Sequence, residues 1–207
     1  MDRLIQYLRT HGWARKGLSV LSVALVVGAV GLLGYPLYTN FYQGRVQDRL
    51  SDELASPDLQ QKYRDGKIGV GESLTRIQIP KLGVDTIVVE GTTASALRAG
   101  AGHYPDTALP CENGNVGIAG HRTTYGKPFA NLDQLAPGDT IILQTPIGSC
   151  TYEVTKQPFI VAPTNLEVVA NTPTTRDLTL TTCHPKHSAR QRLIVKAKFV
   201  SGEPGTA

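Results

Sequence analysis

The longest apolar stretch of the chain lies near its amino terminus. No charged residue occurs between Gly17 and Gly44, and residues 18–37 are dense in leucine, valine and alanine. A helix rises 1.5 Å per residue, so roughly 20 such residues cross a 30 Å hydrocarbon layer. The pattern predicts a transmembrane segment over residues 17–38.

The residues on either side of this segment predict its orientation. Arg15 and Lys16 precede the apolar run directly, and Arg3 and Arg9 add to the same basic cluster against a single acid. By the positive-inside rule, residues 1–16 are expected in the cytoplasm and the rest of the chain outside it. A cleaved signal peptide shares this pattern, but the run is longer than a typical signal core and no A-x-A site follows it. We therefore favour an uncleaved, single-pass membrane anchor.

The composition becomes polar and charged after the apolar run. Residues 45–50 show a short helical pattern, and Pro57 is expected to stop it, after which several glycines loosen the chain. We interpret residues 39–73 as an extracytoplasmic stalk and residues 202–207 as a flexible tail.

Short strand-like segments separated by turn residues make up the rest of the chain. Apolar and polar positions alternate, or apolar residues run together, at 75–79, 86–90, 116–119, 140–144, 151–156, 178–182 and 193–200. Helical patterns are few and short, at 94–99 and 129–135. Many short strands with proline and glycine turns predict a mainly β domain over residues 74–201, built as a closed or nearly closed barrel.

Composition and charge narrow the function classes. The chain has 207 residues, 41% of them hydrophobic, which is enough to bury one medium-sized core. The formal net charge is +4, and part of this excess sits in the basic cluster before the apolar run. Basic residues interleaved with aromatic residues, as in a nucleic-acid surface, are not found on the predicted domain. We therefore expect no nucleic-acid partner.

The cysteines indicate a reactive thiol. Cys183 directly follows the strand-like segment 178–182, with basic residues downstream and His121 far upstream. Cysteine attacks as a thiolate, and at a free pKa of about 8.5 only a few per cent is ionised at neutral pH, so a nearby base or positive charge matters. In an oxidising exterior three cysteines cannot all pair, which makes Cys111 and Cys150 a candidate disulfide. The alternative is that this pair is reduced and that Cys183 is a buried apolar residue.

Several motifs resemble the sortases, the membrane-anchored cysteine transpeptidases of Gram-positive bacteria. They are TLTTCHP at 179–185, SARQR at 188–192 and GIAGHRTTYG at 117–126. The resemblance covers most of residues 74–200 and is closest to class E, the housekeeping type of actinobacteria. It implies an eight-stranded β-barrel with a few short helices, preceded by one transmembrane helix.

The resemblance also implies a reaction and its partners. A sortase cleaves an LAxTG-type or LPxTG-type sorting signal of a secreted protein between Thr and Gly. It then joins the protein through a thioester to an amine of lipid II or peptidoglycan. No cofactor and no metal site are expected, since the acids near the predicted site are too few for a calcium site.

The family's catalytic positions correspond to three residues of this chain. Cys183 is expected to be the nucleophile, His121 the general acid and base, and Arg192 the donor that stabilises the oxyanion and the substrate. His103 is the main competitor of His121. Arg190 is the competitor of Arg192, with a solvated loop charge as its simplest interpretation.

Three further residues are candidates for substrate binding. Thr182 precedes the nucleophile and could orient the substrate or Arg192, although plain strand packing would also explain it. Tyr104 and Tyr125 lie close in sequence to the two histidines considered above. The class E resemblance implies a preference for an LAxTG-type signal over an LPxTG-type signal.

Two other functional classes stay open at this point. Another secreted wall enzyme, such as an L,D-transpeptidase, would need a Ser-x-Gly-Cys-x-Arg pattern that the residues around Cys183 do not supply. A non-catalytic, membrane-tethered barrel could instead bind a partner, or hold zinc through Cys183, His184, His187 and His121. The spacing of these ligands is a weak metal signal.

Overall fold

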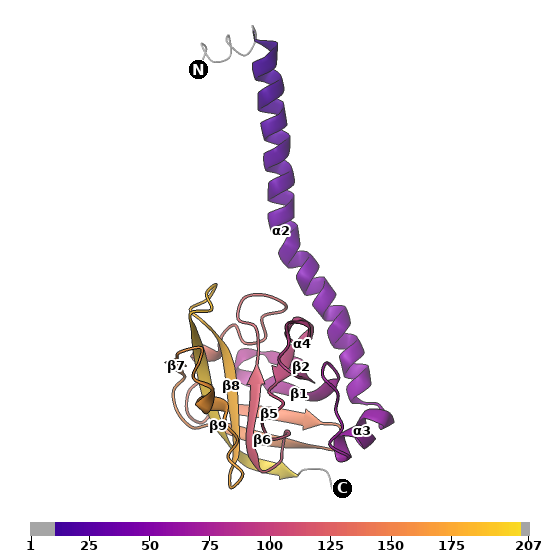
Figure 1. Ribbon diagram of the computed structural model, residues 1–207, viewed down its shortest axis with the longest axis vertical. Coiled ribbons are helices and arrows are strands. Elements are labelled where there is room, and N and C mark those ends of the chain that lie inside the picture. Colours follow the sequence, from indigo (N-terminus) through magenta and orange to yellow (C-terminus); the bar gives the residue numbers. More distant parts are fainter. Residues whose placement is uncertain (1–10, 204–207) are drawn as a thin grey trace. The chain divides into compact units, whose positions relative to one another are not determined.

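The computed structural model describes residues 11–203 (Figure 1). The chain divides into two compact units between Thr39 and Asn40. Helix α2 (Gly12–Leu54) contributes to both units. The first ten residues of the predicted cytoplasmic segment, and residues 204–207 of the predicted tail, lie outside the described part.

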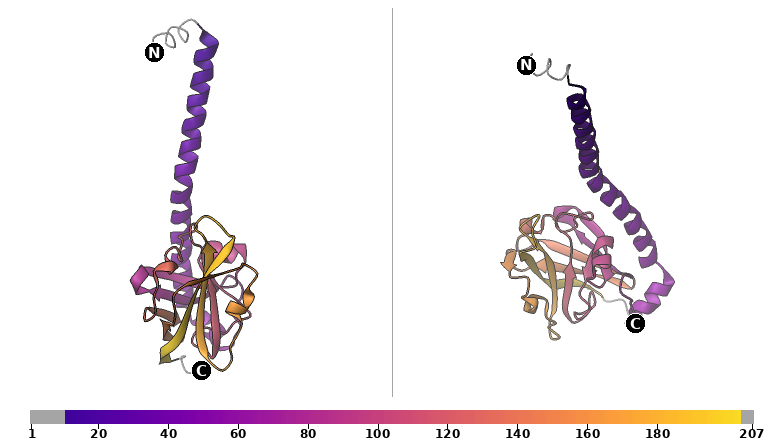
Figure 2. Two further views of the ribbon diagram at one scale, coloured as in Figure 1. Left: turned by 90° about the vertical axis from the view of Figure 1, so that its left-hand side faces the viewer. Right: turned by 45° about the horizontal axis from the view of Figure 1, so that its top comes forward.

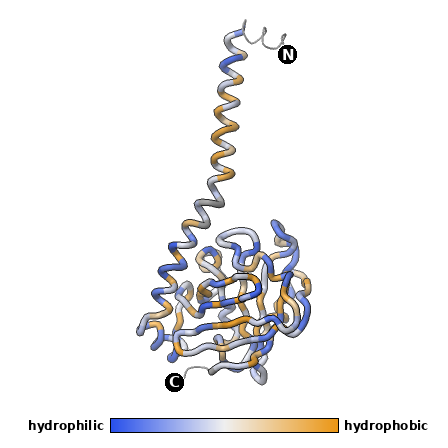
Figure 3. The backbone as a smooth tube through the Cα atoms, turned by 180° about the vertical axis from the view of Figure 1, so that it is seen from behind, coloured by the Kyte–Doolittle hydropathy of each residue, from blue (hydrophilic) through white to orange (hydrophobic). Residues whose placement is uncertain are grey.

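The first unit consists of the amino-terminal part of α2. In the described part of the chain one helical stretch, Gly12–Tyr35, is long and apolar enough to cross a membrane. Its leucine and valine side chains are exposed. Figure 3 shows hydrophobic positions recurring along most of this part of the tube. Exposed apolar residues on all sides of a helix of this length are typical of a segment that lies in lipid. This finding fits the transmembrane segment predicted at 17–38.

The second unit contains a β-barrel (Figure 2). The strands within residues 11–203 are β1 (Ser73–Ile79), β2 (Val84–Glu90), β3 (Ala101–His103), β4 (Gly114–Ala119), β5 (Thr140–Thr145), β6 (Gly148–Val154), β7 (Phe159–Val161), β8 (Arg176–His184) and β9 (Gln191–Glu203). Eight of them follow the order β6-β5-β1-β2-β3-β4-β8-β9, and pairing between β6 and β9 closes the ring. The predicted eight-stranded barrel is confirmed.

The remaining strand, β7, joins the sheet by pairing with β9. Along one edge β9 pairs with β8 over eight residue pairs from Asp177–Lys198 to His184–Gln191. Along its other edge, the first part pairs with β7 and the second part with β6. Strand β7 therefore extends the sheet outside the closed ring. The final pair, Ser149 with Glu203, shows that the strand continues two residues into the predicted tail.

Two pairs of the strands between residues 11 and 203 are parallel, β2 with β3 and β4 with β8. The parallel pair β4–β8 matters for the site, because the carboxyl ends of parallel strands lie at the same edge of a sheet. Its register places Ala119 beside Thr181, each close to the end of its strand.

Alternation along β8 separates the barrel core from the opposite face of the strand. Leu178 and Leu180 are fully buried in the main apolar cluster, together with residues such as Ile118 and Val195 from the neighbouring strands. Because successive side chains of a strand point to opposite faces, Thr179, Thr181 and Cys183 lie on the other face of β8.

The short helices differ in part from the prediction. Helix α4 (Ala94–Ala99) has the predicted bounds, and the side chain of Thr93 caps its first turn. The segment expected to be helical at 129–135 forms a single 3-10 turn, Leu132–Gln134. Pro57 does not only end a helix. It begins α3 (Pro57–Arg64), which Ser56 caps, and proline is well tolerated at that position because no helical partner is lost.

The segment interpreted as a stalk contacts the barrel closely. Leu50 is fully buried, and Gln47 of the same helix receives a hydrogen bond from the backbone N–H of Ile87 at 2.6 Å and donates one to the carbonyl of Ala99 at 2.7 Å. Tyr63 of α3 donates to the carbonyl of Pro110 at 2.9 Å. Residues from Asn40 onward thus belong to the same compact unit as the barrel.

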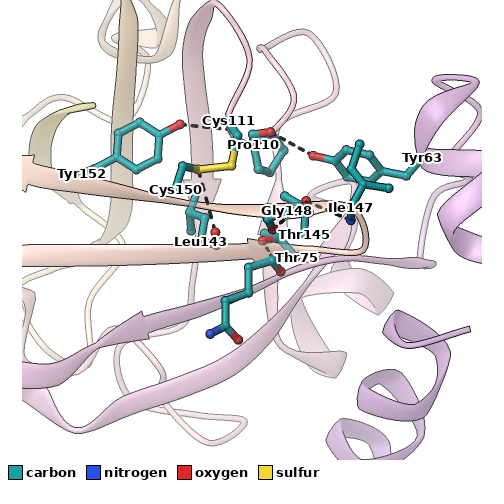
Figure 4. Close-up of a disulfide and its surroundings, with 11 residues drawn as sticks. Tyr63, Thr75, Pro110, Cys111, Leu143, Thr145, Ile147, Gly148, Cys150 and Tyr152 are labelled. Carbon is teal, nitrogen blue, oxygen red and sulfur yellow. Dashed lines mark hydrogen bonds between the residues drawn. A yellow bond between two sulfur atoms is a disulfide. The ribbon is translucent and has the colours of Figure 1, made fainter. Parts of the chain in front are cut away.

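Cys111 and Cys150 form a disulfide with their Cα atoms 5.6 Å apart (Figure 4). Both residues are almost fully buried in the main core cluster. The hydroxyl of Tyr152 accepts the backbone N–H of Cys111 at 3.2 Å. The bridge ties the loop before β4 to the start of β6, and it leaves Cys183 as the free cysteine among the described residues.

We expect the double variant Cys111→Ser/Cys150→Ser to lower the free energy of unfolding by about 3–4 kcal/mol. The bridge closes a loop of 39 residues, so its removal frees conformational entropy in the unfolded chain. Chemical denaturation of the two proteins measures the difference. Thiol counting on the denatured, unreduced protein provides the check: one free thiol agrees with the bridge, and three would contradict it.

Candidate active site

The nucleophile candidate lies near the end of β8. Cys183 is half-buried and pairs in register with Arg192 of β9. Neighbouring residues of an antiparallel pair present their side chains on the same face of the sheet. The cysteine and the arginine therefore lie side by side outside the apolar core.

His121 reaches the same place from another strand. It follows β4 by two residues, and the parallel register of β4 with β8 brings the ends of both strands to one edge. Bonds across this edge fix the arrangement. The N–H of Gly120 donates to the carbonyl of Thr181 at 3.0 Å, and the hydroxyl of Thr182 donates to the carbonyl of Gly120 at 2.7 Å.

The three candidates line one cavity of about 250 Å³. Its walls are formed by Thr92, Leu97, Tyr104, Ala119, Gly120, His121, Thr181, Thr182, Cys183 and Arg192. A larger cavity of about 390 Å³ lies between α2 and residues 126–131, but its lining contains no thiol or imidazole. The chemistry that a thiol nucleophile needs is thus concentrated in the smaller cavity.

The surroundings of His121 favour the neutral imidazole. Burial lowers the pKa of its imidazole below the ordinary value, and the positive charge of Arg98 lowers it further. Both effects disfavour the imidazolium. The ring of Tyr125 packs against the imidazole, with centroids 5.2 Å apart at an interplanar angle of 39°.

Removing the charge of Arg98 should raise the pKa of His121. We expect Arg98→Gln to move it upward, and 0.5 M salt to reduce the difference, because Arg98 is exposed and its field is screened. A step that needs the imidazolium would then persist to higher pH than in the unchanged protein. NMR titration of the His121 ring protons measures the shift, with Arg190→Gln as the matched control. An unchanged or lower pKa in Arg98→Gln would contradict this cause.

His103, the competitor of His121, is buried and bonded within the barrel. His103 is about 1% exposed, and its Nδ1 lies 2.8 Å from a carboxylate oxygen of Glu90. Its Nε2 lies 2.9 Å from both the carbonyl of Ala108 and the hydroxyl of Thr107. Both ring nitrogens are occupied, and His103 does not line the cavity of Cys183.

Arg192 lines the cavity, but its side chain also contacts its own loop. Nη1 donates to the carbonyl of Ala189 at 3.0 Å and to that of Gln191 at 3.1 Å. The guanidinium carries three further N–H groups on Nη2 and Nε. Arg190 is exposed and absent from the cavity lining.

The three substrate-binding candidates occupy different positions. Tyr104 lines the cavity, and its hydroxyl lies 3.1 Å from that of Thr181. Thr182 is almost fully buried, and its hydroxyl joins β8 to Gly120 as described above. Tyr125 contacts His121 and is not part of the cavity lining.

Sequence reasoning missed Arg122. Its side chain is almost fully buried and contacts the carbonyl of Cys183. A basic residue directly after the histidine is visible in the sequence, but burial of its guanidinium depends on the fold.

Within residues 11–203, no three His, Cys, Asp or Glu side chains gather as they would around a metal ion, so the zinc alternative gains no support.

Comparison with known proteins identifies the family of this chain. The Sortase domain family matches residues 77–200. Sortase SrtE1 of Streptomyces coelicolor is 32% identical over 169 residues, which are 72% of this chain and 48% of the relative. The chain thus spans about half the length of that relative. Sortase SrtE2 of the same organism is 29% identical over 92% of this chain and 85% of its own length.

Solved structures show the same likeness. A sortase D5 transpeptidase of Clostridium perfringens has a TM-score of 0.67 at 31% identity, covering 77% of this chain and 98% of that one. Sortase E of Streptomyces avermitilis has a TM-score of 0.60 at 36% identity, covering 66% of this chain and 93% of that one. The chain belongs to the sortase family. Within that family it is class E-like, as its likeness to SrtE1, SrtE2 and sortase E indicates.

Proposed function

We propose that this protein is a membrane-anchored cysteine transpeptidase that cleaves a sorting signal between Thr and Gly and transfers the protein to a cell-wall amine. One observation carries the proposal: Cys183, His121 and Arg192, from three different segments, line one cavity of a sortase barrel. An isolated cysteine could be a core residue. A half-buried thiol beside an imidazole and a guanidinium is suited to acyl transfer.

The first half-reaction forms the thioester. Neutral His121 takes the proton of the Cys183 thiol, which gives a thiolate beside an imidazolium. The thiolate attacks the carbonyl carbon of the Thr–Gly bond, so that an S–C bond forms and the oxygen becomes an oxyanion. The free N–H groups of Arg192 hold this charge. When the C–N bond breaks, its electron pair passes to the glycine nitrogen, which takes the proton of the His121 imidazolium.

The second half-reaction releases the product. An acceptor amine attacks the thioester carbon, the new C–N bond forms, and the C–S bond breaks to restore the thiolate. Neutral His121 takes the proton that the amine loses. The acceptor expected from the class E likeness is an amine of lipid II or peptidoglycan.

The substrate would lie along the cavity beside Tyr104. The hydroxyl pair of Tyr104 and Thr181 provides a polar contact next to the nucleophile. Thr182 supports the cavity through its bond to Gly120, and Tyr125 supports His121. We expect proteins with LAxTG-type or LPxTG-type signals as partners.

The proposed location is the outer side of a membrane. Arg15 and Lys16 precede the apolar helix and favour an inside amino terminus. The disulfide between Cys111 and Cys150 supports an oxidising compartment for the barrel, since such bridges are rare in a reducing cytosol. Both observations support a catalytic domain outside the cytoplasm.

Peptide ligation tests the proposed function. The full-length chain in detergent micelles is incubated with an LAxTG or LPxTG peptide and a primary amine, and the products are analysed by mass spectrometry. We expect cleavage between Thr and Gly and a product in which the amine replaces the glycine. A peptide with the signal in scrambled order is the control. Absence of cleavage with both signals would contradict the proposal.

A further inference from the structure

Arg122 is a charged side chain that the reaction described above does not use. It is about 5% exposed. Nη1 donates to the carbonyl of Cys183 at 3.3 Å and contacts Nδ1 of His184 at 2.9 Å. Nη2 forms an ion pair with Asp133 at 3.1 Å, and Nε donates to the carbonyl of Ala130 at 3.5 Å.

These contacts join two parts of the site that are far apart in sequence. Cys183 and His184 end strand β8, whereas Ala130 and Asp133 belong to the loop between β4 and β5. Arg122 belongs to that loop as well and follows His121 directly. Its guanidinium therefore links the backbone of the nucleophile to the loop that carries the proposed acid.

The bonds on the other side of His121 complete the arrangement. Gly120 is bonded to β8 through its N–H, which donates to Thr181, and through its carbonyl, which accepts from Thr182. Arg122 bonds to the next residue of that strand, Cys183. His121 is thus held by the residue before it and the residue after it, both attached to β8 beside the nucleophile.

We propose that Arg122 is a positioning residue, whose guanidinium sets the place of the His121 imidazole relative to the Cys183 thiol. The proposal rests on the transpeptidase function proposed above. Arg122 does not line the cavity and so would not touch the substrate. It would act through the two residues whose positions it fixes.

The chemistry of arginine suits this role better than that of lysine. A guanidinium offers five N–H groups in a rigid plane, so it can serve a carbonyl, an imidazole nitrogen and a carboxylate at once. A lysine ammonium keeps the charge but has a single centre and a different reach. A lysine at this position should therefore restore part of the restraint and not all of it.

Loss of the guanidinium should affect the chemical step more than substrate binding. Misplacing a reacting group by about 1 Å can cost about 10²-fold in rate. For Arg122→Met, which keeps the apolar bulk and removes all donors, we expect kcat to fall about 30-fold or more, with KM within about threefold of the unchanged protein. For Arg122→Lys we expect a kcat between that of Arg122→Met and that of the unchanged protein.

The experiment compares full-length proteins in detergent micelles with the peptide ligation assay. Circular dichroism first establishes that each variant is folded at the assay temperature. Arg176→Met is the matched control, because Arg176 also bridges segments, through Asn113, but lies at the opposite end of β8. We expect its kcat within about twofold of the unchanged protein.

The outcomes separate this proposal from the proposed function. No ligation by the unchanged protein would overturn the function itself and, with it, this role. If the unchanged protein is active, a folded Arg122→Met with unchanged kcat, or with a loss confined to KM, would overturn the positioning role alone. So would an Arg122→Lys no more active than Arg122→Met.

A second variant decides the matter if Arg122→Met does not fold. Asp133 is about half exposed, so Asp133→Asn removes one restraint on Arg122 with little risk to the core. We expect a fall in kcat of about threefold or more with KM unchanged. Unchanged kcat in Asp133→Asn would then overturn the proposal.

Discussion

Replacing Cys183 with alanine is expected to lower transpeptidation by at least about 10⁴-fold while leaving the fold intact. The variant removes the free thiol of the described chain, and no other residue lining the cavity can form the thioester. The fold should persist because Cys183 is half-buried, lies outside the apolar core cluster and loses a single sulfur atom. Ligation rates and thermal unfolding of the two proteins measure both expectations.

The control for this variant is Cys111→Ser/Cys150→Ser, which also removes sulfur atoms but lies in the core. We expect that control to lose stability and to keep activity at temperatures at which it is folded. A folded Cys183→Ala protein with near-normal turnover would end the interpretation of this cavity as a thiol active site.

The second large effect is expected from the two residues beside the thiol. His121→Ala should lower kcat/KM by about 10²–10³-fold, since it removes the proton donor of the leaving amine. Arg192→Ala should cause a loss of about the same size, since it removes the charge that holds the oxyanion. Steady-state kinetics with the preferred signal peptide provide the measurement.

Two controls test whether these positions are correctly assigned. His103→Ala should mainly lower the melting temperature, because it opens a buried hydrogen-bond network with Glu90. Arg190→Ala should remain within about threefold of normal activity, since Arg190 is exposed and outside the cavity. A crippled His103→Ala beside a normal His121→Ala would show that the acid is assigned to the wrong histidine.

The barrel could largely be predicted from alternation of apolar and polar positions. Seven predicted strands occur in the structure, and six of them are extended by one to several residues because pairing with neighbours continues past the visible pattern. The strand predicted at 151–156 instead begins three residues earlier and ends two residues earlier, as β6. Strands β3 and β7 were missed, since three residues are too few for a period of two to show. Their existence depends on partners that are distant in the chain.

Contacts between distant segments were the part that sequence could not predict. Gln47 is a polar residue on a charged helix, and nothing local indicates that it binds the backbone beside Ile87 and Ala99. Arg122 is similar, because its burial follows from the parallel pairing of β4 with β8. For the same reason Tyr125 was considered only for substrate binding, whereas its ring packs against His121.

The proposed site residues were accessible to sequence analysis for a different reason. Cys183, His121 and Arg192 stand in motifs that resemble the family, and the fold brings them to one cavity. The motifs identify these three residues in the sequence, and the strand order explains why their side chains lie close together. The supporting contacts around them appear only in three dimensions.

Trapping the covalent intermediate tests the central claim most directly. The full-length protein is mixed with a sorting-signal peptide in the absence of an added amine, quenched in acid, digested and analysed by mass spectrometry. The account predicts that the peptide fragment ending in Thr is attached to Cys183 as a thioester, and that hydroxylamine releases it. An acyl group on another residue, or product formation without any adduct on Cys183 under conditions that preserve thioesters, would contradict the account.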